Sequence, residues 1–139
     1  MCSVDKICAC EIATEQDSSS HWSLLYLDLR NNIALHLDSH NNFNVNAAKT
    51  VHLDIMRLLK RECMPGVISI QCLQQNNGYD CGVFTIFHAE FIASKITEIL
   101  TSANPQEIIE AGLPEWNKSR LANFRSELRD EIRSLACKT

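Results

Sequence analysis

The sequence contains no hydrophobic run close to the roughly 20 residues that a membrane-spanning helix requires. Its opening stretch, residues 1–17, carries acidic side chains early and lacks the basic-then-apolar layout of a secretory signal peptide. An excess of positive charge is also missing. The formal net charge is −4 and the pI is near 5.7, which disfavours nucleic acid or an anionic membrane as a partner.

Paired cysteine motifs are absent although the chain has seven cysteines. No C-x-x-C pair or recurring spacing occurs, so we interpret them as free thiols in the reducing cytoplasm or nucleus. Cys8 and Cys10 alternate along a predicted strand and would share a face. With a histidine they could form a zinc site, but the usual ligand spacing is missing. We therefore expect no metal and no cofactor.

The length of 139 residues, with 45% apolar and 22% charged residues, predicts a single soluble domain over 1–139. Alternating or aromatic-rich apolar patterns predict strands over 6–13, 21–29, 33–38 and 67–73, the middle two forming an antiparallel hairpin. Helical periodicity predicts helices over 45–62 and 81–100, and a last one after Pro114. This order indicates an α+β fold with a small, mostly antiparallel sheet.

Three details of the helices are predicted from their patterns. Asn44 or Asn46 is available as the N-cap of the first helix. The helix over 81–100 is apolar on most of its circumference through Ala93 and is expected in the interior. The last helix carries a stripe of apolar residues that we expect to fold back onto the domain: Trp116, Leu121, Phe124, Leu128, Ile132 and Leu135.

Cys81 stands out because it lies in the stretch GYDCG, at the predicted start of the buried helix. A helix N-terminus and a nearby imidazolium both lower the pKa of a thiol and so make it a nucleophile. His21 opens a strand after a polar loop, and Asp38 closes the partner strand of the hairpin, so the two ends should meet. A carboxylate there could orient the imidazole. Gln75 or Gln74 could direct an amide N–H at an oxyanion.

Each of these residues also has an ordinary structural interpretation. Cys81 could be a small core residue, which is the commonest use of a buried free cysteine. His21 could be an exposed residue at a strand start, Asp38 a turn residue and Gln75 a solvated loop residue. The other histidines, His36, His40, His52 and His88, fit surface or packing positions. Spacing alone does not decide between the two interpretations.

The combination of three motifs decides between the structural and the catalytic interpretation. HW at 21–22, DSH at 38–40 and QNNGYDCG at 75–82 resemble the ubiquitin-like-protein-specific cysteine proteases, the sentrin/SUMO protease family. Their active site is written His-Trp, then Asp, then Q-x-N-x-x-D-C-G. The order and the two spacings agree, because Asp38 follows His21 by 17 residues and Cys81 follows Gln75 by six. The stretch from His21 to His40 looks most like the deneddylase branch, which acts on the Nedd-type modifier.

The resemblance implies a papain-like fold and a cysteine protease that cleaves after the Gly-Gly tail of a ubiquitin-like modifier, of Nedd type or alternatively SUMO type. It implies that Cys81 is the nucleophile, His21 the general base and Asp38 its orienting partner. Gln75 would be the oxyanion donor. Trp22 would wall a narrow slot for the glycine tail, and the other residues implied in substrate binding are Asn77, Gly78 and Asp80.

Relative to that family the chain lacks the segment that usually precedes the first strand, including a Trp-Leu-Asn-Asp-like stretch. We therefore expect an N-terminally shortened domain and keep two interpretations. The first is an active protease, because all four chemical residues are present. The second is a remnant with little or no catalytic activity that binds a ubiquitin-like protein, because part of the substrate-holding surface is missing.

Overall fold

A computed structural model describes residues 7–12, 20–61 and 66–137, with the backbone alone for 7–12 and 118–119. The predicted polar loop before His21 and the predicted helix-ending turn after Arg61 therefore lie largely outside the described residues. So do the side chains of Cys8 and Cys10, on which the shared-face prediction depends. In the described part, no helix is long and apolar enough to span a membrane.

Four strands form one sheet in the order β1-β2-β3-β4: β1 (Ile7–Ile12), β2 (His21–Asp28), β3 (Ile33–Leu37) and β4 (Ile68–Ile70). The pairs β1–β2 and β2–β3 are antiparallel, whereas β3–β4 is parallel. The prediction of a mostly antiparallel sheet in an α+β fold is thus confirmed. The fourth strand is shorter than the predicted 67–73.

The tight turn between β2 and β3 follows from its polar residues. The Asp28 carboxylate accepts hydrogen bonds from the backbone N–H groups of Arg30 and Asn31, each at 3.0 Å. Asn32 has a φ of 54°, a left-handed conformation that asparagine tolerates better than most residues. The predicted hairpin is confirmed, and its geometry brings the start of β2 and the end of β3 to the same edge of the molecule.

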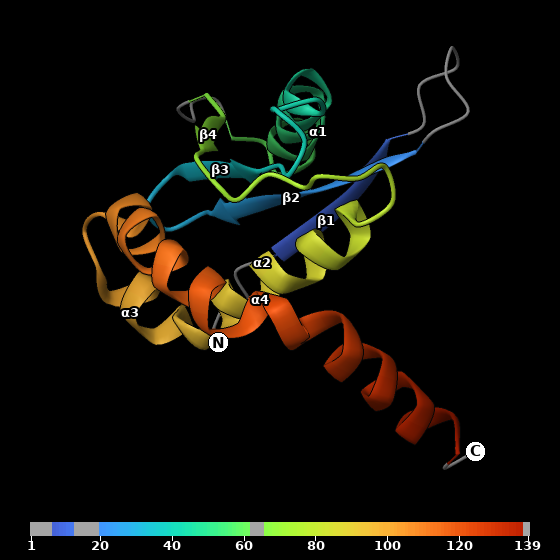
Figure 1. The fold of residues 1–139 in the computed structure, drawn as a ribbon. Coiled ribbons are helices and arrows are strands. Elements are labelled where there is room, and N and C mark those ends of the chain that lie inside the picture. Colours follow the sequence, from blue (N-terminus) through green and yellow to red (C-terminus); the bar gives the residue numbers. More distant parts are fainter. Residues whose placement is uncertain (1–6, 13–19, 62–65, 138–139) are drawn as a thin grey trace.

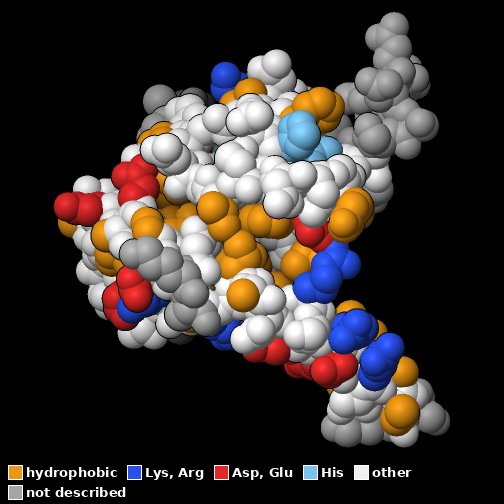
Figure 2. Space-filling model, viewed as in Figure 1, with side chains coloured by type: hydrophobic (Ala, Val, Ile, Leu, Met, Phe, Trp, Pro, Cys, Tyr) orange, Lys and Arg blue, Asp and Glu red, His pale blue; other side chains and the backbone are white. Residues whose placement is uncertain are grey.

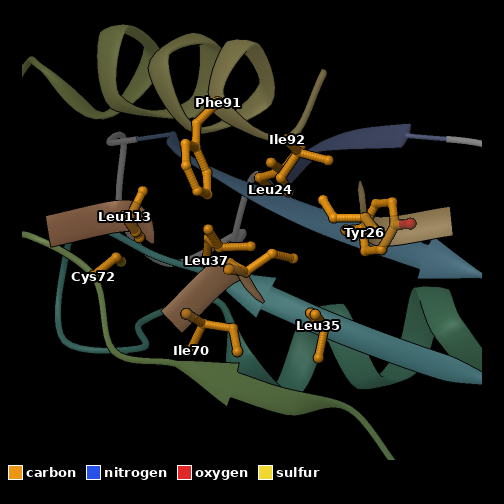
Figure 3. Packing of buried hydrophobic residues seen from close by; sticks show 11 residues of the cluster. Leu24, Tyr26, Leu35, Leu37, Ile70, Cys72, Phe91, Ile92 and Leu113 are labelled. Carbon is orange, nitrogen blue, oxygen red and sulfur yellow. The ribbon is translucent and has the colours of Figure 1, made fainter. Parts of the chain in front are cut away.

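The two faces of the sheet are covered by different helices, because side chains alternate along each strand. Leu25 and Leu27 of β2 pack on the face covered by α1 (Val45–Leu58). Leu24 and Tyr26 pack on the opposite face, which is covered by α2 (Cys81–Ser94) (Figure 1). Figure 3 shows this second cluster, the larger of the two, which includes α2 residues and Leu113.

The predicted single helix over 81–100 is divided into α2 and α3 (Ile96–Thr101), with Lys95 between them. The Ser94 hydroxyl donates a hydrogen bond to the carbonyl of Phe91 at 2.7 Å, a local bond that competes with the helical ladder. The interior position predicted for this helix holds for most of its circumference. The exceptions are Ile86, with 47% of its surface exposed, and the two last residues, Ala93 and Ser94.

The last helix, α4 (Pro105–Ala136), differs from the prediction at its start. It begins at Pro105, not after Pro114, which lies inside it. A proline inside a helix costs about 3 kcal/mol. Here the preceding turns bury Ile109 and Leu113 in the core, and that packing offsets the cost.

The expected folding back of this helix occurs only in its first half. Phe124 packs against Phe87 with ring centroids 5.0 Å apart. Beyond it Ile132 and Leu135 are 58% and 59% exposed, and the distal half extends away from the body (Figure 1). Figure 2 shows basic side chains beside hydrophobic ones along this projecting half. The amphipathic stripe thus predicted the helix but not how far it packs.

Candidate active site

His21 and Asp38 are in direct contact at the open end of the β2–β3 hairpin. His21 Nε2 lies 2.7 Å from Asp38 Oδ1, and the two residues are only 8% and 1% exposed. The strand ends predicted to converge do converge. Because Nε2 is engaged by the carboxylate, Nδ1 is the ring nitrogen left to face another group.

Backbone amides fix the other side of the Asp38 carboxylate. The N–H of His40 donates to Oδ1 at 2.8 Å, and the N–H of Asn44 donates to Oδ2 at 2.9 Å. The loop can curl around the carboxylate because Asn41 and Asn42 adopt left-handed conformations with φ of 48° and 58°. The carboxylate is thereby held in one orientation toward His21.

Asn44 occupies the N-cap position of α1, as predicted, but its side chain makes no capping hydrogen bond. Its amide group instead donates to the carbonyl of His21 at 2.8 Å and to the hydroxyl of Ser23 at 3.2 Å. Sequence reasoning gave it only a capping role. The signal that could have revealed more is its place six residues after Asp38, beyond an asparagine pair able to reverse the chain.

Cys81 is the first residue of α2 and is 7% exposed. The turn before it is built by Asn77, whose Oδ1 accepts hydrogen bonds from the N–H groups of Tyr79 and Asp80 at 3.1 and 2.9 Å. Its amide also donates to the Asp80 carboxylate at 2.7 Å. This turn presents the thiol at the N-terminus of α2.

A small open pocket of about 160 Å³ brings the predicted chemical groups together. Its lining comprises Ser20, His21, His40, Phe43, Gln75, Gly78 and Cys81. The rings of His40 and Phe43 pack edge-on against His21, with centroids 5.4 and 5.6 Å from it. Figure 2 shows histidine side chains reaching the surface in one place, beside hydrophobic ones. His40 and Phe43 were not predicted as parts of the site.

The structure separates the two candidate glutamines. Gln75 lines the pocket, and its Nε2 donates to the carbonyl of Asn77 at 2.6 Å. Gln74 has a structural place, because its Nε2 donates to the carbonyls of Asp38 and Cys72 at 3.1 and 3.0 Å. Of the two, Gln75 is therefore the one that lines the pocket, and its oxyanion role stays a prediction.

The residues predicted to bind substrate do not all line this pocket. Gly78 does, whereas Asn77 and Asp80 are engaged within the protein. The Asp80 carboxylate also forms an ion pair with Arg125 of α4. Trp22 is half-buried next to His21 and is absent from the pocket lining. The substrate role of Trp22, Asn77 and Asp80 stays a prediction.

Buried histidines near the site are neutral. Burial lowers the pKa of His36, with His21 adding to the effect and Asp38 opposing it. His36 Nε2 lies 2.9 Å from the Ser23 hydroxyl and 3.9 Å from Asp38 Oδ2. Burial also lowers the pKa of His88 to about 4 and that of His52 more modestly. Because His36 is neutral, it does not compete with His21 for an ionic interaction with the Asp38 carboxylate.

The side chains that the structure describes include no group of three or more His, Cys, Asp or Glu placed to hold a metal ion. Three cysteines are free among them: Cys72 and Cys81, both buried, and Cys137, which is exposed. Burial raises the pKa of Cys72 to about 11, so this thiol is protonated at neutral pH. Cys72 is therefore not a competing nucleophile.

Comparison with protein families supports the class that this geometry suggests, a papain-like cysteine protease. The model of the Ulp1 protease family, C-terminal catalytic domain, matches residues 12–110. This match covers more than half of the sequence, and the chain belongs to the Ulp1 protease family. The expected α+β, papain-like fold class is confirmed. No match was found among curated proteins.

Solved structures are similar at low sequence identity. The SUMO protease Ulp1, with its catalytic cysteine oxidised to a sulfenic acid, is 23% identical over 75% of this chain and 52% of its own, with a TM-score of 0.49. The C-terminal Ulp1 protease domain in complex with Smt3, the yeast ortholog of SUMO, is 22% identical over 74% and 51%, with a TM-score of 0.49.

The Xanthomonas campestris effector XopD, bound to ubiquitin, is 20% identical over 78% of this chain and 60% of its own, with a TM-score of 0.50. The chain thus spans roughly half to three-fifths of the length of these solved structures. At this identity the likeness concerns the fold.

Proposed function

We propose that the chain is a cysteine protease that cleaves after the C-terminal Gly-Gly of a ubiquitin-like modifier, most specifically a Nedd-type modifier. The observation that carries the proposal is the convergence of three groups. The 2.7 Å His21–Asp38 contact lies on the same pocket as a thiol at a helix N-terminus. Membership of the Ulp1 protease family supports the same reaction class.

The proposed reaction begins with proton transfer from the Cys81 thiol to His21 Nδ1. The thiolate attacks the carbonyl carbon of the terminal glycine, and Asp38 stabilises the imidazolium that forms. Gln75 Nε2 and N–H groups at the start of α2 donate hydrogen bonds to the oxyanion. The tetrahedral intermediate then collapses and expels the lysine amine of the substrate, which takes the proton from His21.

The remaining thioester is hydrolysed by water. His21 removes a proton from the attacking water and returns it to the departing thiol, so the enzyme is regenerated. The small pocket fits a substrate tail without side chains, and we propose that Trp22 adds to this exclusion beside His21. Specificity would come from excluding side chains, and affinity from a larger protein–protein surface. A thiol nucleophile and free cysteines suit a reducing compartment, the cytoplasm or nucleus.

The preference for a Nedd-type modifier rests on the sequence from His21 to His40, and SUMO is the competing substrate. The direct test is a panel of Nedd-type, SUMO and ubiquitin proteins that each carry a C-terminal electrophile. We expect a covalent adduct with the Nedd-type probe, lost in Cys81→Ala and retained in Cys72→Ala. Cys137→Ala controls for labelling of the exposed thiol.

The alternative function is binding of a ubiquitin-like protein without catalysis. The observation in its favour is that Cys81 is buried, with only 7% of its surface exposed. A folded, monodisperse sample that binds the modifier in a titration but forms no adduct with any probe would establish this alternative. An adduct with the SUMO probe alone would keep the protease and reassign its substrate.

A further inference from the structure

We propose that Asn44 is a positioning residue that holds the His21–Asp38 pair in register. The inference rests on the proposed function and deepens it, because Asn44 would act on the rate through His21 and Asp38 without touching the substrate. The carrying observation is that one buried residue, 2% exposed, contacts both members of the pair.

The two contacts use different groups of Asn44. Its backbone N–H donates to Asp38 Oδ2 at 2.9 Å, on the carboxylate oxygen that does not face His21. Its side-chain Nδ2 donates to the backbone carbonyl of His21 at 2.8 Å. A single residue therefore fixes both the carboxylate and the strand end that carries the imidazole.

The same amide group also connects Asn44 to Ser23 and, through Ser23, to His36. Nδ2 also lies 3.2 Å from the Ser23 hydroxyl, which in turn lies 2.9 Å from His36 Nε2. His36 is fully buried, so this series of hydrogen bonds lies on the interior side of Asp38. These hydrogen bonds join buried groups and restrict their movement, and a catalytic hydrogen bond requires such a fixed geometry.

A capping asparagine would not need this arrangement. At an N-cap the side-chain oxygen accepts a hydrogen bond from the helix it precedes. In Asn44 no such bond is made, and the amide nitrogen is directed at β2 instead. The side chain thus makes no local capping bond. It contacts His21 and Ser23 instead, which lie 23 and 21 positions earlier in the sequence.

The primary test is Asn44→Ala, with Asn46→Ala as the matched control, because Asn46 is exposed two residues further along the chain. We expect Asn44→Ala to lower kcat about 10- to 100-fold with little change in KM, as for other groups that orient a catalytic residue. Asn46→Ala should match the wild type.

Asn44→Asp separates hydrogen-bond donation from packing, because the two side chains have nearly the same shape. An ionised carboxylate cannot donate to the His21 carbonyl, so this variant should also be slow. Should Asn44→Ala fail to fold, Asn44→Ser keeps one donor and is expected to be intermediate in rate. A variant set with lowered melting temperature but unchanged kcat would overturn the proposal and leave Asn44 a residue of the fold alone.

A readout that does not depend on turnover keeps this proposal distinguishable from the proposed function. The proton between His21 and Asp38 should give a downfield signal in the ¹H NMR spectrum of the wild type. We expect that signal to broaden or move upfield in Asn44→Ala and to stay in Asn46→Ala. An unmoved signal would contradict positioning, even if no probe labels the chain.

Discussion

Gln75 and Ser39 are joined by two hydrogen bonds that tie the loop of Asp38 to the loop of Cys81. The backbone N–H of Gln75 donates to the carbonyl of Ser39 at 2.8 Å, and the Ser39 hydroxyl donates to Gln75 Oε1 at 2.7 Å. The oxygen end of the amide is thereby fixed. One hydrogen of Nε2 is donated to the carbonyl of Asn77, and the other is left for a substrate oxyanion. Ser39 was not predicted as part of the site.

Replacement of Gln75 should slow the reaction far more than it weakens binding. Gln75→Ala removes the proposed oxyanion donor, and we expect kcat to fall about 10²- to 10³-fold. Ser39→Ala should give a smaller loss, because the amide stays but can turn. Steady-state kinetics with a fluorogenic modifier substrate measures both. Equal losses in the two variants, or none in Gln75→Ala, would leave the backbone N–H groups as the main donors.

Asp38→Asn should keep the fold and remove most of the activity. An amide can donate to His21 and favour the wrong tautomer, and it cannot stabilise the imidazolium. In a Ser-His-Asp triad the same change costs about 10⁴-fold in kcat. Circular dichroism checks the fold and single-turnover labelling checks the rate. Labelling at the wild-type rate would remove Asp38 from the mechanism.

His88 should make the protein sensitive to acid. It is fully buried, neither ring nitrogen has a hydrogen-bond partner, and burial lowers its pKa to about 4. Between pH 6.5 and 4 the unfolded chain binds a proton that the folded chain does not. The free energy of unfolding therefore falls as the pH falls, by roughly 3 kcal/mol in all from this residue.

His88→Leu should flatten that dependence. The variant is expected to be at least as stable as the wild type at pH 7 and clearly more stable at pH 4.5, in urea titrations at both values. His40→Leu, which removes an exposed imidazole, serves as the control and should leave the slope unchanged. An equal slope in His88→Leu and the wild type would assign the acid sensitivity to other groups.

Cys72 should resist alkylation under conditions that modify Cys81. Its pKa is raised to about 11, first by burial, and its Sγ lies 3.1 Å from the carbonyl of Asp38. We expect iodoacetamide at pH 7 to modify Cys81 and the exposed Cys137, with Cys72 unmodified in peptide mass spectra. Preincubation with an electrophilic modifier probe should protect Cys81 and leave Cys137 reactive. Rapid alkylation of Cys72 in the folded protein would contradict its raised pKa.

Local sequence was a good guide wherever one element is specified by its own residues. The hairpin between β2 and β3 was predictable because the Asp28–Asn32 turn chemistry lies between two apolar strands. The start of α2 was predictable because glycine and asparagine surround the turn before Cys81. The end of α2 and the start of α4 were not. The sequence alone does not show that α2 ends at Ser94 or that α4 continues through Pro114. Both outcomes depend on hydrogen bonds and packing around these residues.

In the candidate site, too, some residues were predictable from local sequence and others were not. The residues His21, Asp38, Gln75 and Cys81 could be named from motif order and spacing, because a pattern of residue types is a property of the chain itself. The residues around them could not. Asn44 and Phe43 lie in no motif, and Ser39 and His40 lie in the DSH motif without a role assigned to them. The places of all four depend on a loop that folds back through two left-handed asparagines.

The sequence by itself determined the protein family, the order of the chemical groups, and the hairpin and helix start near which they lie. Only the tertiary structure decided which glutamine faces the pocket, which buried histidines stay neutral and what Asn44 holds. Those outcomes depend on hydrogen bonds between residues 20 to 40 positions apart and on exclusion of water. Neither is encoded in any short stretch of the chain, because both arise only when the hairpin, the asparagine loop and the first turn of α2 meet.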